Sequence, residues 1–429
     1  MFAPFRVRSF RFQWGADLAM SWASEMEVLI LGWYVLVESG SVSLLAVFGA
    51  LQYAGSLVSP LFGVAGDRLG YAQIFWASRA IHAALAAVIL VMAWTGALSP
   101  PAVLAVAAMA GMLRPSDMVM RYAVTARILP PGQLMGGLGI ARITSDSARI
   151  AGALAGAATV TAFGMVWAYA AIVCLYSLSA LLTMAIRVDP APDVLPGEKV
   201  GSSSDRLDTS GGRLDTSGGR LDTSTWNDLR SGFAYLGGKP VLLGAFGLAF
   251  LVNLLAFPFF LGLLPYVARH HYAVGQEGLS TMAASFAVGG LLGSILVGSN
   301  RLPRSAARVM IVAAMVWFTA DLLFAFNRDF GFGIALLIAA GLASSVCLTP
   351  LAAVMLRSTD LEFRGRVMGM RMLAIWGLPL GLLCAGPLIE AFGFRLTAAC
   401  YAILGGFLCL AIAVRWRKHL WSRSAVANL

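Results

Sequence analysis

Two groups of charged residues recur at helical spacing inside stretches of the sequence that are otherwise apolar. They are Arg114, Asp117 and Arg121, and Arg142, Asp146 and Arg149. Within each group the residues lie three or four positions apart, which places them on one face of an α-helix. An ionised side chain at the centre of a lipid bilayer costs at least about 2.5–3.5 kcal/mol, so such residues mark substrate pathways, proton relays or paired networks. We therefore expect most of them to line a substrate cavity, or to pair and hold neighbouring helices in register.

The first apolar stretch contains only acidic charges. They are Asp17, Glu25 and Glu27. Together with the two groups above, five acids face four arginines, so complete pairing leaves one carboxyl group without a cation. A buried carboxyl group that lacks a cation binds a proton readily, and it can couple proton entry to the exit of another solute. We assign this role to Glu25, with Glu27 next and Asp17 as a third candidate. In the second half of the chain, Asn253 is the polar residue that we expect in the cavity.

The elements that position these side chains are membrane-spanning helices. Hydrophobic residues make up 59% of the 429 residues and charged residues 12%, whereas soluble domains contain about 25% charged residues. The mean hydropathy is +0.80. Apolar runs of about 20 residues, the length that crosses a bilayer, recur along the chain. The sequence predicts an all-α integral membrane protein with twelve transmembrane helices in two pseudo-symmetric six-helix bundles. The spans lie near 14–37, 42–66, 73–97, 101–124, 136–162, 164–186, 241–267, 274–299, 306–327, 332–356, 366–391 and 394–416.

A long polar stretch separates the two sets of six spans. We predict an N-terminal bundle over 1–187, a linker over 188–239 and a C-terminal bundle over 240–429. The linker repeats RLDTSGG with one leucine per unit and Gly-Gly pairs between units, which excludes a coiled coil and favours a flexible spacer. A regulatory or partner-binding arm is the alternative. The segment NDLRSGFAYLGGKP at its end is predicted to form an amphipathic helix on the membrane surface.

The distribution of positive charge predicts the orientation of the chain. Arginine and lysine residues concentrate in alternate breaks and in both terminal segments, so the positive-inside rule places both termini and the linker in the cytoplasm. This topology also explains the net charge of +10 without nucleic acid as a partner. The partners that we expect are a small-molecule substrate and the lipid bilayer, and we expect a monomer.

The sequence lacks the patterns that enzymes and metalloproteins share. Five cysteines lie singly in apolar runs, and no nucleophile motif, phosphate-binding glycine loop or metal-ligand spacing occurs. His270 and His271 adjoin each other on an external break, where surface exposure is the expected state. We therefore predict neither catalysis nor a cofactor nor a metal site.

One loop resembles the signature of a known family. GVAGDRLGY, between the second and third spans, is similar to the G-x-x-x-D-R-x-G-R loop of the major facilitator superfamily, with Gly63, Asp67, Arg68 and Gly70 at the matching positions. Basic residues that usually follow in the family are replaced by Tyr71, Ala72 and Gln73. LVGSNRLPRSAAR, in the second half, resembles a degenerate copy of this loop, with Asn300 and Arg301 at the places of Asp67 and Arg68. The matching residues are Gly63, Asp67, Arg68, Gly70, Asn300 and Arg301.

The resemblance implies a cytoplasmic gate at these loops. Arg121 occupies the place of the arginine in the fourth span of the family, and we expect it to contact Asp67 as part of a latch. The resemblance also implies that spans 1, 4 and 5 line the cavity. The stretches GWYVLVESGS, ARIAGALAG, NDLRSGFAYLGGKP and FRGRVMGMRML are similar to the branch that includes macrolide efflux and enterobactin exporter proteins. This branch implies a bacterial cytoplasmic (inner) membrane.

Three functions follow as hypotheses. The leading one is proton-coupled export of a small amphipathic organic molecule by alternating access, because an apolar second half would face a charged first half. The second is transport of a siderophore or another organic anion, in either direction, attracted by the interior arginines. The third is a membrane scaffold that keeps the fold, does not transport, and uses the linker for docking.

Overall fold

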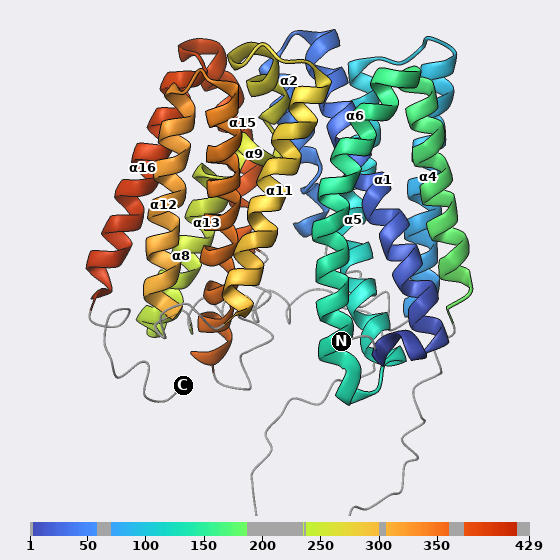
Figure 1. Ribbon diagram of the computed structural model, residues 1–429, viewed down its shortest axis with the longest axis horizontal. Helices are drawn as coiled ribbons and strands as arrows, with labels where there is room; N and C mark the ends of the chain where they lie inside the picture. The colour runs from blue at the N-terminus through green and yellow to red at the C-terminus, as the bar shows by residue number, and fades with distance from the viewer. Residues whose placement is uncertain are drawn as a thin grey trace, which may run out of the picture.

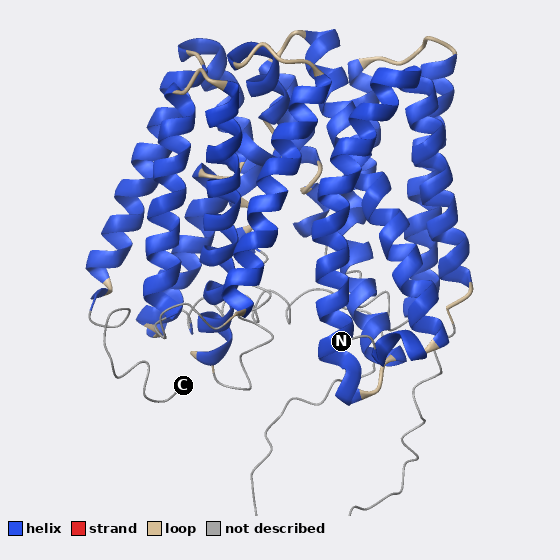
Figure 2. Ribbon diagram, in the orientation of Figure 1, coloured by secondary structure: helices blue, strands red, loops and turns tan. Residues whose placement is uncertain are grey.

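The structure is a computed structural model that describes residues 3–57, 70–186, 235, 237–299, 306–359 and 373–417. Every regular element within these ranges is helical (Figure 2). The elements of the first half are η1 (Ala3–Arg6), α1 (Arg8–Ser39), α2 (Val42–Leu51), η2 (Ala54–Leu57), α4 (Tyr71–Trp94), α5 (Pro100–Ile128) and α6 (Pro131–Met184). Those of the second half are α8 (Pro240–Leu255), α9 (Pro258–Leu261), α10 (Leu264–Tyr266), η3 (Val267–His271), α11 (Gln276–Gly298), α12 (Ala306–Phe326), α13 (Phe330–Arg357), α15 (Gly377–Phe392) and α16 (Phe394–Arg415).

The helices form two bundles that stand side by side (Figure 1). Helices of the first half gather on the right of the view and those of the second half on the left, with α2 and α15 near the junction. The predicted all-α membrane fold is confirmed. We call the end at which α1 begins and α16 ends the near end, and the opposite end the far end. Most of the linker, including its tandem repeat, lies outside the described residues, and the domain boundaries 1–187, 188–239 and 240–429 stay predictions.

Most predicted spans correspond to single helices, and glycine marks the turn between two of them. The spans predicted over 136–162 and 164–186 form α6, which is broken at Gly164 with φ 81° and ψ 176°. This backbone conformation is open to glycine and strained for other residues. At the end of α1, Gly40 adopts a left-handed conformation and its N–H bonds to the Leu36 carbonyl, while Ser41 caps the first turn of α2.

The seventh predicted span departs from expectation, since 241–267 is not one helix. α8 ends at Leu255, and the chain continues as the short helices α9 and α10 and then as a π-helical turn, η3. Pro258 and Pro265 each occupy the start of a short helix and lack a backbone N–H, and Gly262 lies between them. Proline cannot complete the hydrogen bonds of a continuous helix, which explains the two breaks.

The outer surface of the bundles is apolar. In the described residues, seven helices are long and apolar enough to cross a membrane, and the spans of 10–17 residues in α2, α5, α8 and α15 are apolar but shorter. Trp94 is 77% exposed and Trp167 is 68% exposed, whereas Arg79 is completely buried. This distribution is the reverse of that in a soluble protein and requires lipid as the outer solvent.

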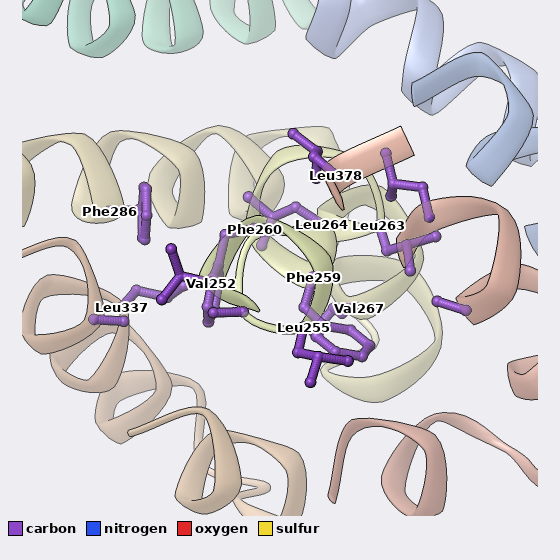
Figure 3. Close-up of a cluster of buried hydrophobic side chains, with 14 of the residues drawn as sticks. Val252, Leu255, Phe259, Phe260, Leu263, Leu264, Val267, Phe286, Leu337 and Leu378 are labelled. Carbon is purple, nitrogen blue, oxygen red and sulfur yellow. The ribbon is translucent and has the colours of Figure 1, made fainter. Parts of the chain in front are cut away.

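The core of the second half is formed around the broken seventh span (Figure 3). Phe260 stacks on Phe286 of α11, with ring centroids 5.1 Å apart, and Phe257 packs edge-on against Trp317 of α12 at 4.7 Å. α11 and α13 also approach closely, because a Cβ atom on Gly341 would lie 2.0 Å from the Phe286 carbonyl oxygen. The second half is therefore held together mainly by apolar packing.

The two halves touch at the far end through α2 and α15. Glu390 of α15 accepts hydrogen bonds from the Ser41 hydroxyl at 3.0 Å and from the Ser43 backbone N–H at 3.2 Å. Gly386 lies against α2 so closely that a Cβ atom there would be 2.9 Å from the Ala46 Cβ atom. A carboxylate of the second half thus caps the first turn of a helix in the first half.

Candidate transport site

A buried ion cluster joins four helices of the first half. Arg79 of α4 bonds to Asp17 of α1 and donates from Nε to Asp117 of α5 at 3.0 Å. Its third nitrogen donates to the Thr183 hydroxyl of α6 at 2.9 Å. Arg121 donates to the other oxygen of Asp117 at 2.9 Å and lies 3.6 Å from Asp17. The cluster places two acids against two arginines, so its net charge is zero.

Arg79 is the functional residue that the sequence analysis missed, and it changes the charge balance. With Arg79, five acids face five arginines instead of four, so the count of residues leaves no acid in excess. The signal was present, since Arg79 is the only Asp, Glu, Lys or Arg in the span predicted over 73–97. It was overlooked because the third span was not expected to contribute to the cavity.

Glu25 has a cation close by, in contrast to the expectation that it lacks one. Its Oε1 atom lies 3.6 Å from Nε of Arg149, and the two side chains are 30% and 41% exposed. α6 comes close enough for this pair because Gly152 faces α1, where an added Cβ atom would lie 3.0 Å from the Glu25 Cβ atom. Asp146 is buried on the same helix, one turn before Arg149. The Arg142 side chain lies outside the described residues.

Glu27 has a different environment, because its bonding partner is neutral. Its side chain is buried, and its Oε2 atom accepts a hydrogen bond of 2.7 Å from the Tyr176 hydroxyl of α6. His82 of α4 lies beyond Tyr176, with ring centroids 5.7 Å apart, and its Nδ1 atom is bonded to the Ser78 carbonyl. Among the described residues, no cation lies within 4 Å of the Glu27 carboxylate. Glu27 therefore matches the sequence-based description of an unpaired acid better than Glu25 does.

Arg114 faces a small cavity between the two halves. Its guanidinium donates to Ser24 at 2.6 Å and to Gln52 at 3.3 Å. The cavity has a volume of about 40 Å³. Its lining from the first half includes Val28, Phe48, Gln52, Tyr53 and Arg114, and its lining from the broken seventh span includes Phe260, Leu261, Leu264 and Pro265. A cation and an amide on one side thus oppose an apolar wall on the other.

Two polar residues of the second half, Asn253 and Asp321, are buried. Asn253 is buried on α8, and its Nδ2 atom donates to the Ala249 carbonyl of the same helix at 2.8 Å. In the described part of the chain it is not part of the cavity lining. Asp321 is buried on α12, and neither carboxyl oxygen has a hydrogen-bond partner among the described residues.

The predicted gate falls mostly outside the described residues. This holds for Gly63, Asp67, Arg68, Asn300 and Arg301. Gly70 is described and precedes α4 with φ 92°, a conformation that favours glycine. The predicted contact between Arg121 and Asp67 also lies outside the described residues. Within them, the Arg121 side chain contacts Asp17 and Asp117 and donates to the Ser145 hydroxyl at 3.4 Å.

Known proteins share this architecture. The model of the Major Facilitator Superfamily matches residues 18–305. No curated protein matches the sequence. Among solved structures, the chain is similar to the nucleoside transporter NupG at 16% identity, with 95% of this chain and 98% of that chain covered and a TM-score of 0.69. A bacterial homologue of the human lysosomal transporter Spinster, inward-facing and occupied, has 14% identity, coverage of 97% and 99%, and a TM-score of 0.68. The POT family transporter PepTSo has 11% identity, coverage of 96% and 99%, and a TM-score of 0.72.

At these identities the solved structures establish the fold alone, whereas the family model spans most of the chain. The drug- and siderophore-exporting branch is not distinguished by either comparison. The ion cluster of Asp17, Arg79, Asp117 and Arg121 lies among these helices. This chain belongs to the Major Facilitator Superfamily, and it is a multi-pass secondary transporter of a small molecule, not an enzyme.

Proposed function

We propose that this protein is a proton-coupled transporter that moves a small amphipathic organic molecule by alternating access of two bundles. The observation that carries the proposal is Glu27, a buried carboxylate bonded to a neutral hydroxyl and adjacent to the cavity-facing residues of α1. A carboxylate in this setting can exist with or without a proton, and each state favours a different balance of charge in the first half. The role that the sequence assigned to Glu25 passes to Glu27 in this proposal.

Export is the direction that we propose for neutral or positively charged cargo. Such cargo and a proton compete for the negative charge of Glu27, so proton entry displaces cargo. The apolar wall of Phe260, Leu264 and Pro265 supports an amphipathic cargo, because these residues offer surface and no polar partner. Membership of the drug-exporting branch, location in a bacterial inner membrane and cytoplasmic termini are parts of the same proposal.

An acidic cargo is the second candidate, and Arg114 favours it. In the described part of the chain, no carboxylate lies within 4 Å of the Arg114 guanidinium, which faces the cavity between the halves. Arginine binds carboxylate and phosphate groups through paired hydrogen bonds. A siderophore or organic acid that binds there would travel with protons rather than against them.

Flux measurements in proteoliposomes test the proposal. The purified protein is reconstituted, a pH gradient is imposed, and movement of amphipathic cations, neutral molecules and anions is followed. We expect accumulation of at least one class to depend on the gradient. Glu27→Gln is expected to abolish gradient-driven accumulation and to spare exchange of cargo for cargo.

Glu277→Gln is the matched control, since Glu277 is exposed at the start of α11. It is expected to transport like the unmodified protein. Gradient-driven accumulation that persists in Glu27→Gln would remove Glu27 from the mechanism. The absence of gradient-dependent flux for every class would refute proton coupling.

A further inference from the structure

Arg114 is hydrogen bonded to α1 one turn away from Glu27. The Arg114 guanidinium donates to the Ser24 hydroxyl at 2.6 Å. Ser24 lies on α1 one turn before Glu27, whose carboxylate accepts a hydrogen bond of 2.7 Å from the Tyr176 hydroxyl. The residue that holds the cation and the carboxylate are therefore neighbours on one face of α1.

Arg114 and Glu27 are the charges left over when the other ion pairs are formed. Asp17 and Asp117 pair with Arg79 and Arg121, and Glu25 pairs with Arg149. In the described residues of α1 and α5, the embedded charges without an ion pair within 4 Å are Glu27 and Arg114. The charge of Arg114 nevertheless acts on Glu27 through the low dielectric between them.

Arg114 and Glu27 differ in their access to the cavity between the halves. Arg114 and Gln52 line the cavity between the halves, whereas Glu27 is buried behind it and is not part of the lining. The cavity of about 40 Å³ is large enough for an acidic group or for roughly three waters, but not for a whole organic molecule. The head group of a cargo would therefore fit between Arg114 and the apolar wall.

We infer that Arg114 binds the acidic group of the cargo, and that its charge couples this site to Glu27 so that an acidic cargo and a proton bind together. An anion on Arg114 takes up the positive charge that balances Glu27. A proton on Glu27 restores neutrality in a region where water cannot screen the charge. A cationic cargo has the opposite effect and competes with the proton. The inference rests on the proposed function and specifies its second candidate.

The other polar groups around Glu27 agree with this assignment. α6 presents Tyr169 and Tyr176, α5 presents Arg114, and α4 presents His82 behind Tyr176. The tyrosines are neutral, and His82 uses Nδ1 to bond the Ser78 carbonyl of its own helix. Arg114 is thus the permanent charge that faces Glu27.

Binding and proton uptake are measured together on the full-length protein in lipid nanodiscs. The probes are 1-naphthoate and 1-naphthylmethylamine, which share a ring system and differ in charge. Each is added to a weakly buffered sample with a pH indicator, and binding is followed by equilibrium dialysis. We expect saturable binding of naphthoate with uptake of protons. The amine is expected to bind more weakly and to release protons.

Three variants test which residues bind naphthoate and which take up the proton. Arg114→Gln is expected to weaken naphthoate binding by about tenfold or more, the loss of one charge-assisted hydrogen bond. Glu27→Gln is expected to bind naphthoate without proton uptake. Tyr176→Phe, which changes little volume, is expected to keep binding and to lose most of the uptake. The controls Arg328→Gln and Glu277→Gln, both at exposed positions, are expected to behave like the unmodified protein.

The outcomes separate the inference from the proposed function. Unsaturable naphthoate binding, tighter binding of the amine, or proton uptake that persists in Glu27→Gln overturns the inference. If proteoliposomes still move the amine with a pH gradient in that case, the proposed function stands without the inference. If naphthoate binds with proton uptake but no probe crosses the membrane under a gradient, the inference stands and the proposed function fails.

Discussion

Replacement of Arg79 by glutamine should strongly destabilise the first half. The arginine is completely buried and bonds to Asp17, Asp117 and Thr183. Without Arg79, the two carboxylates remain in a low dielectric. Among the described residues, Arg121 is then the cation in contact with them. Breaking a buried ion pair by removing one partner costs about 3–5 kcal/mol, because the remaining charge keeps its desolvation penalty. We expect a loss in this range from Arg79→Gln.

Arg121→Gln provides the internal comparison. Its side chain is 14% exposed and lies 3.6 Å from Asp17, so water and the longer distance reduce its contribution. We expect a loss of about 1–3 kcal/mol, typical of charge-assisted hydrogen bonds. The assay is the free energy of unfolding in mixed detergent micelles, followed by tryptophan fluorescence during titration with a denaturing detergent. Arg328→Gln, at an exposed position, serves as the control.

A rescue experiment distinguishes lost pairing from lost volume. Arg79→Met combined with Asp17→Asn removes one arginine and one acid, and it leaves Asp117 paired with Arg121. If the reasoning is correct, this double variant is more stable than Arg79→Met alone, despite the additional substitution. An Arg79→Gln variant that loses less than about 1 kcal/mol would refute the reasoning, because exposed ion pairs already contribute that much. A double variant less stable than the single one would also refute it.

Three further predictions concern other parts of the structure. Gly341→Ala should cost about 1–3 kcal/mol of unfolding free energy, because the added methyl would meet the Phe286 carbonyl oxygen; unchanged stability would contradict the close packing of α11 and α13. Glu390→Gln should weaken the contact with Ser41 and increase the population open at the far end, measured by spin-label distances between α2 and α15; an unchanged distance distribution would show that this contact does not hold the halves together. Burial keeps the pKa of His271 below its ordinary value of 6.5, so the neutral ring stabilises the fold above about pH 6.5 and this stability is lost as the pH falls toward the lowered pKa. His271→Gln should remove that part of the pH dependence in thermal unfolding, and a variant with an unaltered profile would contradict the assignment.

The fold was predictable from the sequence because lipid imposes a simple rule. Each span needs about 20 apolar residues with internally bonded backbone, and the sequence displays these runs between short polar breaks. The seventh span was predicted less well. Its composition is as apolar as that of its neighbours, and the breaks depend on how Pro258, Gly262 and Pro265 are spaced. A hydropathy average does not register the loss of two backbone donors.

The site was predictable in composition but not in pairing. Helical spacing showed which charges share a face, and the sequence identified Asp17, Asp117, Glu27 and Arg114 as candidates. It did not show that Glu25 lies near Arg149 or that Glu27 meets a hydroxyl, because these contacts join α1 to α6, and Glu27 and Tyr176 are 149 residues apart in the chain. Partners between helices depend on rotation and depth, and neither is written in the spacing along one helix.

The ion cluster also has a consequence for how the chain is made. Asp17 is synthesised 62 residues before its partner Arg79, and Asp117 follows Arg79 after 38 more. α1 therefore leaves the ribosome with an acid whose cation does not yet exist, at a cost of about 2.5–3.5 kcal/mol if it enters lipid alone. We therefore expect α1 to insert most stably together with α4 and α5, because both acids of the ion cluster then have their arginines.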